Sequence, residues 1–150
     1  MGENLGLVPK AVDAALHRHH YLGTWIFPTT TDPPPEDTLA VLATHDMAPW
    51  ATFWATATDQ QRRMLKRLVD VNDPNPTAKS MLGPILEALF KSPSRLVMVN
   101  LEDLYGETLP VNVPGTSTDQ NWTRKMRRTW QDILNEPEIQ AFLPIMARKR

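Results

Sequence analysis

The sequence contains no cysteine, which excludes a disulfide framework, a thiolate metal site and a cysteine nucleophile. Its 16 basic and 17 acidic side chains leave a net charge of -1, so no global field draws the protein to nucleic acid or to an anionic membrane. No apolar run approaches the roughly 18 residues of a membrane helix. The opening MGENLGLVPK also lacks the basic and apolar regions of a signal peptide. We therefore expect a cytoplasmic protein with neither nucleic acid nor membrane as a partner.

The composition that remains is typical of one ordinary soluble domain. The 150 residues are 41% hydrophobic and 22% charged, with both signs mixed, which is enough apolar material for a real core. Proline is abundant, with 14 residues that include DPPPED at 32–37, and it stiffens the connections between elements. We find no internal repeat and no linker, so residues 1–150 are expected to form one unit without a second domain.

Short apolar runs alternate with helical patterns along the chain. The runs of strand length are residues 22–27, 38–44 and 95–100, and the helical stretches are 8–20, 59–71, 75–90, 121–134 and 136–149. The second and third runs are continuously apolar, as in strands that are covered on both faces of a parallel sheet. We expect the 75–90 helix to break or restart at Gly83 and Pro84. The succession predicts an α/β fold, with fewer strands than a closed barrel needs.

Polar side chains follow the predicted strands, where parallel α/β folds place their binding crevice. They are His45, Asp46, Asn100, Glu102 and Asp103, together with Glu3, which lies just before the first helical stretch. Two or more carboxylates at one mouth suit glycoside chemistry, because a general acid and an anionic partner must flank the bond that is cleaved. A helix cap or a solvated loop charge is the alternative for any one of these acids.

Two other groups of residues have competing interpretations. The HRHH segment at 17–20 could place two histidines on one helix face, but no acidic or cysteine partner has ligand spacing, so we expect no metal site. Among the tryptophans, Trp130 fits the buried stripe of its helix. Trp25, Trp50, Trp54 and Trp122 lie near strand ends or loops, where an aromatic face could stack on a sugar or pack in the core.

Four segments taken in order resemble one enzyme family. GENLGLVPKAV, ATHDMAPWATFW, LVMVNLEDLYGETLPVNVPGT and NWTRKMR are similar to the C-terminal part of the 4-α-glucanotransferases of glycoside hydrolase family 77, the amylomaltases or disproportionating enzymes. The resemblance spans nearly the whole chain. It implies a (β/α)₈ barrel of which this chain would be the C-terminal portion, an incomplete and helix-rich part with about three to four β/α units.

The resemblance also implies a role for individual residues. Glu3 in GENLG would be the general acid/base, and Asp46 in THD would be the carboxylate that stabilises the transition state. His45 would contact the sugar in the same subsite, with Asn112 and Trp122 as further substrate contacts.

Trp50, in the same segment as Asp46, is our remaining candidate for substrate binding. The family's nucleophile is another aspartate, on an earlier barrel strand that this chain does not match. No cofactor and no metal are implied.

We therefore expect a retaining transferase of α-1,4-glucan segments between maltodextrins, present as a fragment that is inactive alone and that works with the missing N-terminal part of the enzyme. The alternative is a non-catalytic module that binds glucan or a partner protein, in which the tryptophans stack on sugars and the acids bind hydroxyls. A partial gene product with no function of its own is a third reading.

Overall fold

The computed structural model of the chain describes residues 23–26, 34–117, 119–126 and 128–147. Glu3, the HRHH segment and the predicted 8–20 helix lie outside these residues. The described strands are β1 (Gly23–Ile26), β2 (Thr38–Val41) and β3 (Leu96–Met98). The described helices are α2 (Trp50–Thr56), α3 (Asp59–Leu68), α4 (Ala78–Lys91), α5 (Leu101–Leu104), α6 (Trp130–Leu134) and α7 (Pro137–Met146).

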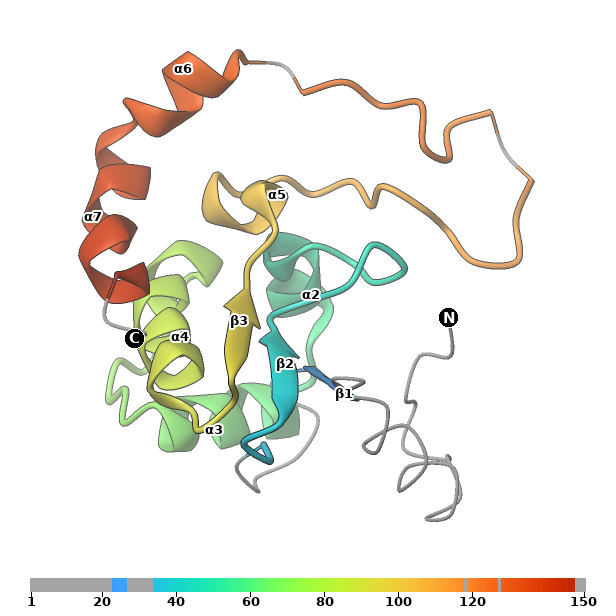
Figure 1. Cartoon of the computed structure of the whole chain (residues 1–150). Coiled ribbons are helices and arrows are strands. Elements are labelled where there is room, and N and C mark those ends of the chain that lie inside the picture. Colours follow the sequence, from blue (N-terminus) through green and yellow to red (C-terminus); the bar gives the residue numbers. More distant parts are fainter. Residues whose placement is uncertain (1–22, 27–33, 118, 127, 148–150) are drawn as a thin grey trace.

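The three strands form one sheet in the order β1-β2-β3 (Figure 1). The sheet is parallel, as the apolar runs predict. Gly23 of β1 pairs with Thr38 of β2, and Leu39 of β2 pairs with Leu96 of β3. A hydrogen bond connects the amino ends of β2 and β3, where the buried hydroxyls of Thr38 and Ser94 lie 2.7 Å apart. The α/β class predicted from the sequence is confirmed for this part of the chain.

The hydrophobic core lies between one face of the sheet and the helices. Ala40 and Leu42 pack there against helical residues that include Trp54, Leu65 and Leu86. On the other face of β3, Leu96 and Met98 are exposed. Helix α7 packs along α4, and none of the described helices is long and apolar enough to cross a membrane.

Helix α4 runs without interruption through Pro84, so the predicted break at that position is wrong. Proline removes one backbone donor, but residues on both sides of it, Met81 and Ile85, are fully buried in the core. Gly83 reduces the local strain, because it has no Cβ to clash with the proline ring. Packing along the whole helix therefore outweighs the missing hydrogen bond.

The predicted helix over residues 121–134 is also mostly wrong. Only Trp130–Leu134 is helical, and the described residues before it form turns and irregular chain. Ile133 supplies the buried contact of this short helix, whereas Trp130 is 63% exposed and is not on a buried stripe. The described residues between α5 and α6 (105–117, 119–126 and 128–129) instead form a long excursion over the carboxyl end of the sheet (Figure 1).

Thr77 caps α4 with a reciprocal pair of bonds, in which its side chain accepts from the Ser80 N–H and the Ser80 side chain accepts from the Thr77 N–H. We expect Thr77→Ala to lower the free energy of unfolding by about 1 kcal/mol, because donors at the start of the helix lose their acceptor. Urea denaturation measures this loss. Thr56→Ala, which removes an exposed hydroxyl bonded only within its own helix, is the control, and an equal loss in both variants would contradict the prediction.

Candidate active site

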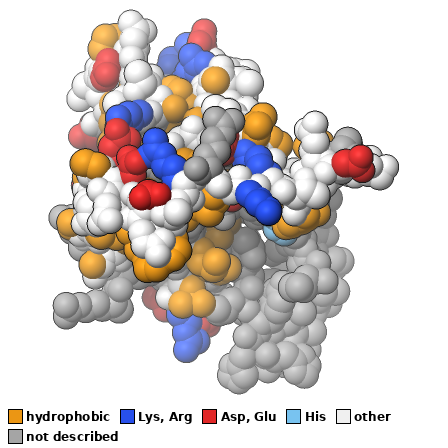
Figure 2. All heavy atoms as spheres, turned by 90° about the horizontal axis from the view of Figure 1, so that it is seen from above, with side chains coloured by type: hydrophobic (Ala, Val, Ile, Leu, Met, Phe, Trp, Pro, Cys, Tyr) orange, Lys and Arg blue, Asp and Glu red, His pale blue; other side chains and the backbone are white. Residues whose placement is uncertain are grey.

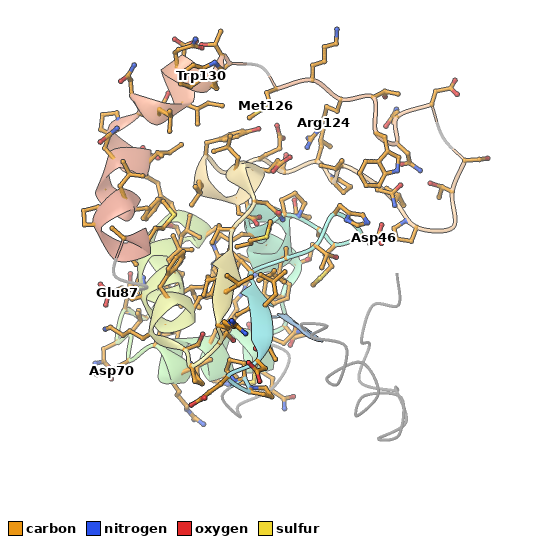
Figure 3. All side chains as sticks on the ribbon, in the orientation of Figure 1. Asp46, Asp70, Glu87, Arg124, Met126 and Trp130 are labelled. Atoms are coloured by element: carbon orange, nitrogen blue, oxygen red, sulfur yellow. The ribbon has the colours of Figure 1, made fainter. Side chains whose placement is uncertain are left out.

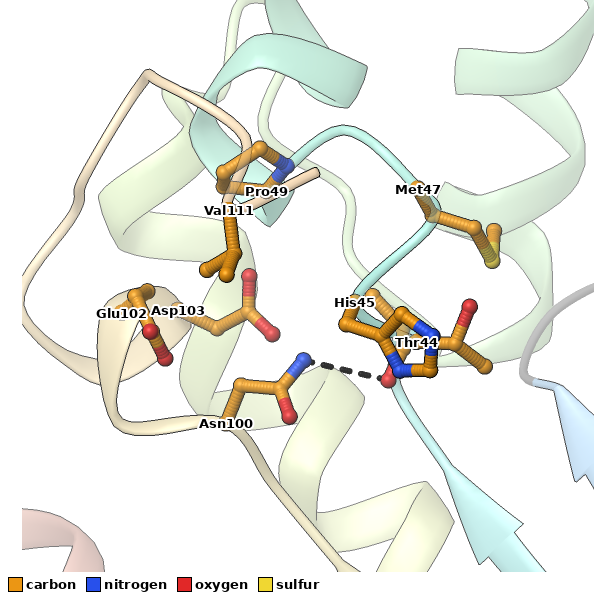
Figure 4. A pocket seen from close by; sticks show the side chains of 9 residues that line it. Thr44, His45, Met47, Pro49, Asn100, Glu102, Asp103 and Val111 are labelled. Atoms are coloured by element: carbon orange, nitrogen blue, oxygen red, sulfur yellow. Dashed lines mark hydrogen bonds between the residues drawn. The ribbon is translucent and has the colours of Figure 1, made fainter. Parts of the chain in front are cut away.

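The carboxyl ends of β2 and β3 open on a common cavity of about 190 Å³ (Figure 4). Its lining residues are Ala43, Thr44, His45, Met47, Pro49, Asn100, Glu102, Asp103 and Val111. They come from the β2–α2 loop (residues 42–49), from the start of α5 and from the long excursion after it. Polar groups that follow two different strands thus meet at one mouth, as the strand-end argument predicts.

His45 and Asp46 lie at the tip of the β2–α2 loop and contact the long excursion. His45 Nε2 is 3.2 Å from Asp46 Oδ2, and the Asn112 side-chain amide donates a short hydrogen bond to Asp46 Oδ1. The His45 ring lies 4.9 Å from the Trp122 ring, centroid to centroid, at a tilt of 50°. Four residues that the sequence singled out therefore form one cluster, and Figure 3 shows Asp46 projecting beside the excursion.

A tight local structure places Trp122 against the histidine. The Asn121 side chain accepts from the Val113 N–H at 3.1 Å and donates to the Thr116 carbonyl at 3.0 Å, which closes the NVPGT turn on itself. The Trp122 N–H then donates to the Val111 carbonyl at 3.0 Å. Trp122 has a φ of 63°, a left-handed conformation that is unusual for a bulky residue and that strains the backbone.

An ion pair links the two ends of the excursion to each other. Arg124 Nη1 lies 3.3 Å from Glu107 Oε1, and both side chains are largely buried from solvent. Glu107 further accepts from the Thr108 N–H at 2.8 Å, so the carboxylate joins the two ends of the excursion.

The excursion exposes several apolar side chains, which are Leu109, Val113, Trp122 and Met126. Figure 2, which views the molecule from above, shows hydrophobic and charged groups interspersed on the upper face.

Asp103 is the most deeply buried acid among the described residues, with 1% of its surface exposed. Burial raises the pKa of its carboxyl to about 6, and the nearby Glu102 carboxylate adds to the rise. The Trp50 N–H, which donates to Asp103 Oδ1 at 2.7 Å, and the neighbouring Asn100 amide both lower the pKa, but by less. The sequence placed Asp103 at this mouth but did not predict its bond to the start of α2, because no local pattern signals a contact between residues so far apart.

Comparison with known proteins decides the family. The model of glycoside hydrolase family 77, 4-alpha-glucanotransferase, matches residues 1–131. The chain belongs to the 4-alpha-glucanotransferase family. The resemblance noted in the sequence is thereby confirmed. No curated protein matches the chain.

Two solved structures of amylomaltases share the fold. The chain superposes on the amylomaltase from Streptococcus agalactiae in complex with acarbose with a TM-score of 0.77 and 23% identity, covering 97% of this chain and 30% of that one. The amylomaltase from Corynebacterium glutamicum gives a TM-score of 0.51 and 22% identity, covering 81% of this chain and 24% of that one. The chain therefore spans less than a third of the length of either amylomaltase.

Trp50 does not join the cluster in this glucanotransferase-family chain. Its side chain is 3% exposed in the core, its indole N–H donates to the Ala78 carbonyl at 2.7 Å, and its ring packs on Phe53 and Trp54. The prediction that Trp50 contacts substrate at this mouth is wrong, because the first turn of α2 directs the ring away from the loop and into the helices. Within the described part of the chain, no group of three or more histidine or acidic side chains could hold a metal ion.

Proposed function

We propose that this chain carries part of the active site of a retaining 4-α-glucanotransferase, and that Asp46 is the carboxylate that stabilises its transition state. The observation that supports this most directly is the geometry of Asp46. It lies beyond the carboxyl end of a parallel strand, in contact with His45 and Asn112 and beside the exposed Trp122. That is a carboxylate fixed in place and still open to a ligand.

The proposed chemistry follows from the charge that develops during glycoside cleavage. The sugar passes through an oxocarbenium-like transition state, which a fixed negative charge favours more than it favours the neutral ground state. The Asn112 amide and the His45 ring orient Asp46, so little reorganisation is needed when the cation forms. The face of Trp122 supplies a stacking surface for a pyranose ring. Glu3, outside the described residues, is proposed as the general acid/base on the strength of its GENLG motif.

We further propose that residues 1–150 form the C-terminal portion of a single (β/α)₈ barrel. The three strands are parallel and follow one another in sequence order, as barrel strands do. Val97 packs on the helical core while Leu96 and Met98 of the same strand are exposed, which suits a strand whose second face would meet the barrel interior. The remainder of such a barrel would then supply the nucleophile, and residues 1–150 alone would transfer no glucan.

Glucan binding by the isolated chain is the first test. We expect acarbose or maltoheptaose to change the tryptophan fluorescence of the wild-type chain, and Trp122→Ala to remove the change and weaken binding by about tenfold, because one stacking contact is lost. Trp130→Ala is a matched control, since Trp122 and Trp130 are 62% and 63% exposed and Figure 3 places Trp130 far from Asp46. Equal effects of the two variants would refute a specific site at Trp122.

Turnover separates the transferase from the alternative, a non-catalytic glucan-binding or partner-binding module. The chain is incubated with maltotriose, alone and together with the N-terminal part of the enzyme, and the products are analysed for glucose and longer maltodextrins. We expect disproportionation only in the mixture. Binding that persists without turnover in the mixture would favour the module, and robust disproportionation by the chain alone would overturn the need for a second part.

A further inference from the structure

The loop that presents Asp46 is held at both of its ends by one short piece of the chain. At the first end, the Asn100 side-chain amide donates to the Ala43 carbonyl at 3.1 Å. At the other end, the Trp50 N–H donates to Asp103 Oδ1 at 2.7 Å. The Asp103 N–H in turn donates to the Asn100 carbonyl at 3.1 Å, so the two holding side chains belong to the same turn at the start of α5.

The loop has little internal structure of its own. The backbone hydrogen bond from the Met47 N–H to the Thr44 carbonyl, at 3.1 Å, is the one seen inside it among the described residues. The position of the β2–α2 loop therefore depends on the contacts at its two ends and at its tip. Asn112 contacts the tip from the long excursion, whereas Asn100 and Asp103 hold the two ends from the turn that directly follows β3.

Asp103 also completes the start of α2. The N-cap position of that helix is Pro49, which makes no side-chain cap bond, so the first N–H groups lack the usual local acceptor. The Asp103 carboxylate takes this place from a distant part of the sequence, and a negative charge at a helix N-terminus is favourable. A carboxylate that is 1% exposed needs such partners, because burial without them is costly.

We propose that Asp103 and Asn100 are positioning residues, which hold the two ends of the β2–α2 loop and thereby set the position of Asp46 in the site. The inference rests on the proposed function for its consequence in glucan binding, but the clamp itself is a property of the fold. Asp103 needs no contact with substrate in this role. It acts through the backbone of Trp50.

Two variants of Asp103 and a control separate positioning from general stability. Asp103→Leu removes the acceptor, whereas Asp103→Asn keeps an oxygen at the same place. Ser94→Ala removes the buried hydroxyl contact with Thr38, at the amino end of β2, and leaves the loop untouched. Each folded chain is followed by amide hydrogen exchange of the loop and Trp50, and by maltoheptaose titration of Trp122 fluorescence.

We expect Asp103→Leu to speed exchange at Trp50 and the loop by about tenfold or more, the loss expected for one hydrogen bond to a charged group. It should also weaken maltoheptaose binding, because the same loop carries His45, which packs on Trp122. Asp103→Asn should restore both within about twofold, and Ser94→Ala should change neither by more than that. Loop exchange in Asp103→Leu equal to wild type, or an equal loss in Ser94→Ala, would overturn the clamp.

Two further outcomes are informative. If Asp103→Leu does not fold, Asn100→Ala tests the other end of the loop, where we expect faster exchange at residues 44–46, and wild-type exchange there would overturn the proposal. If the wild-type chain binds no maltoheptaose, the proposed function fails, and the exchange measurements still decide whether the clamp exists.

Discussion

Asp46→Asn should lower kcat for maltotriose disproportionation by about 100- to 1,000-fold, the loss typical of removing one preorganised group that stabilises transition-state charge. The substitution keeps the size of the side chain and its contact with Asn112, but it removes the negative charge that we propose stabilises the oxocarbenium-like sugar. KM should change much less, because the interaction is strong only in the transition state. The assay uses this chain together with the N-terminal part of the enzyme.

Asp70→Asn is the matched control for this experiment. Asp70 is an exposed aspartate with a φ of 53°, a conformation that asparagine also tolerates, and Figure 3 places it far from Asp46. We expect the activity of Asp70→Asn to stay within about twofold of wild type, because a surface substitution away from the site has little effect.

A higher KM with unchanged kcat for Asp46→Asn would contradict the transition-state role. That result would indicate that Asp46 only binds the substrate.

Asp103 should make the chain less stable as the pH rises, and Asp103→Asn should remove that dependence. The pKa of the buried carboxyl is raised from 3.8 to about 6, so the folded state binds a proton more tightly than the unfolded state. The stability that the neutral acid contributes is complete below pH 4 and is lost as the pH rises through about 6. Together these pKa values correspond to a loss on the order of 3 kcal/mol between pH 4 and pH 8.

Urea denaturation of wild type and Asp103→Asn at pH 4, 6 and 8 measures this effect as a difference between the two chains, so the other ionisable groups cancel. We expect the variant to gain stability relative to wild type as the pH increases, with most of the change between pH 4 and pH 7. Asp70→Asn should follow wild type at every pH. A constant difference between wild type and Asp103→Asn would show that desolvation of the carboxylate costs nothing in the fold.

The strands were predictable because each is a short apolar run bounded by polar or proline-rich segments. Ala40 and Leu42 belong to a continuous run that the structure buries, and the rule that parallel strands share one functional edge brought His45 and Asp103 to the same mouth. Asp46 and Asn112 are far apart in the sequence, and only the resemblance to the family led us to expect them in one site. Their hydrogen bond depends on how the excursion folds back, which local pattern does not encode.

The wrong predictions for Pro84 and Trp50 share one cause: the local conformational preference of a residue does not decide whether it is buried. Pro84 is a helix breaker by itself, yet α4 continues through it because Met81 and Ile85 are both in the core. Trp50 and Trp122 looked alike in the sequence. One is 3% exposed and the other 62%, because α2 turns the first ring inward whereas the Asn121 turn holds the second beside His45.

By itself the sequence determined the alternation of strands and helices, the absence of thiol chemistry and the motifs that mark the glucanotransferase family, because periodicity, composition and motif order are local properties. The tertiary structure decided which tryptophan faces the site, how Asn112 meets Asp46, and that Asp103 holds the start of α2. Those contacts join residues 50 or more positions apart, and only chain packing brings such residues together.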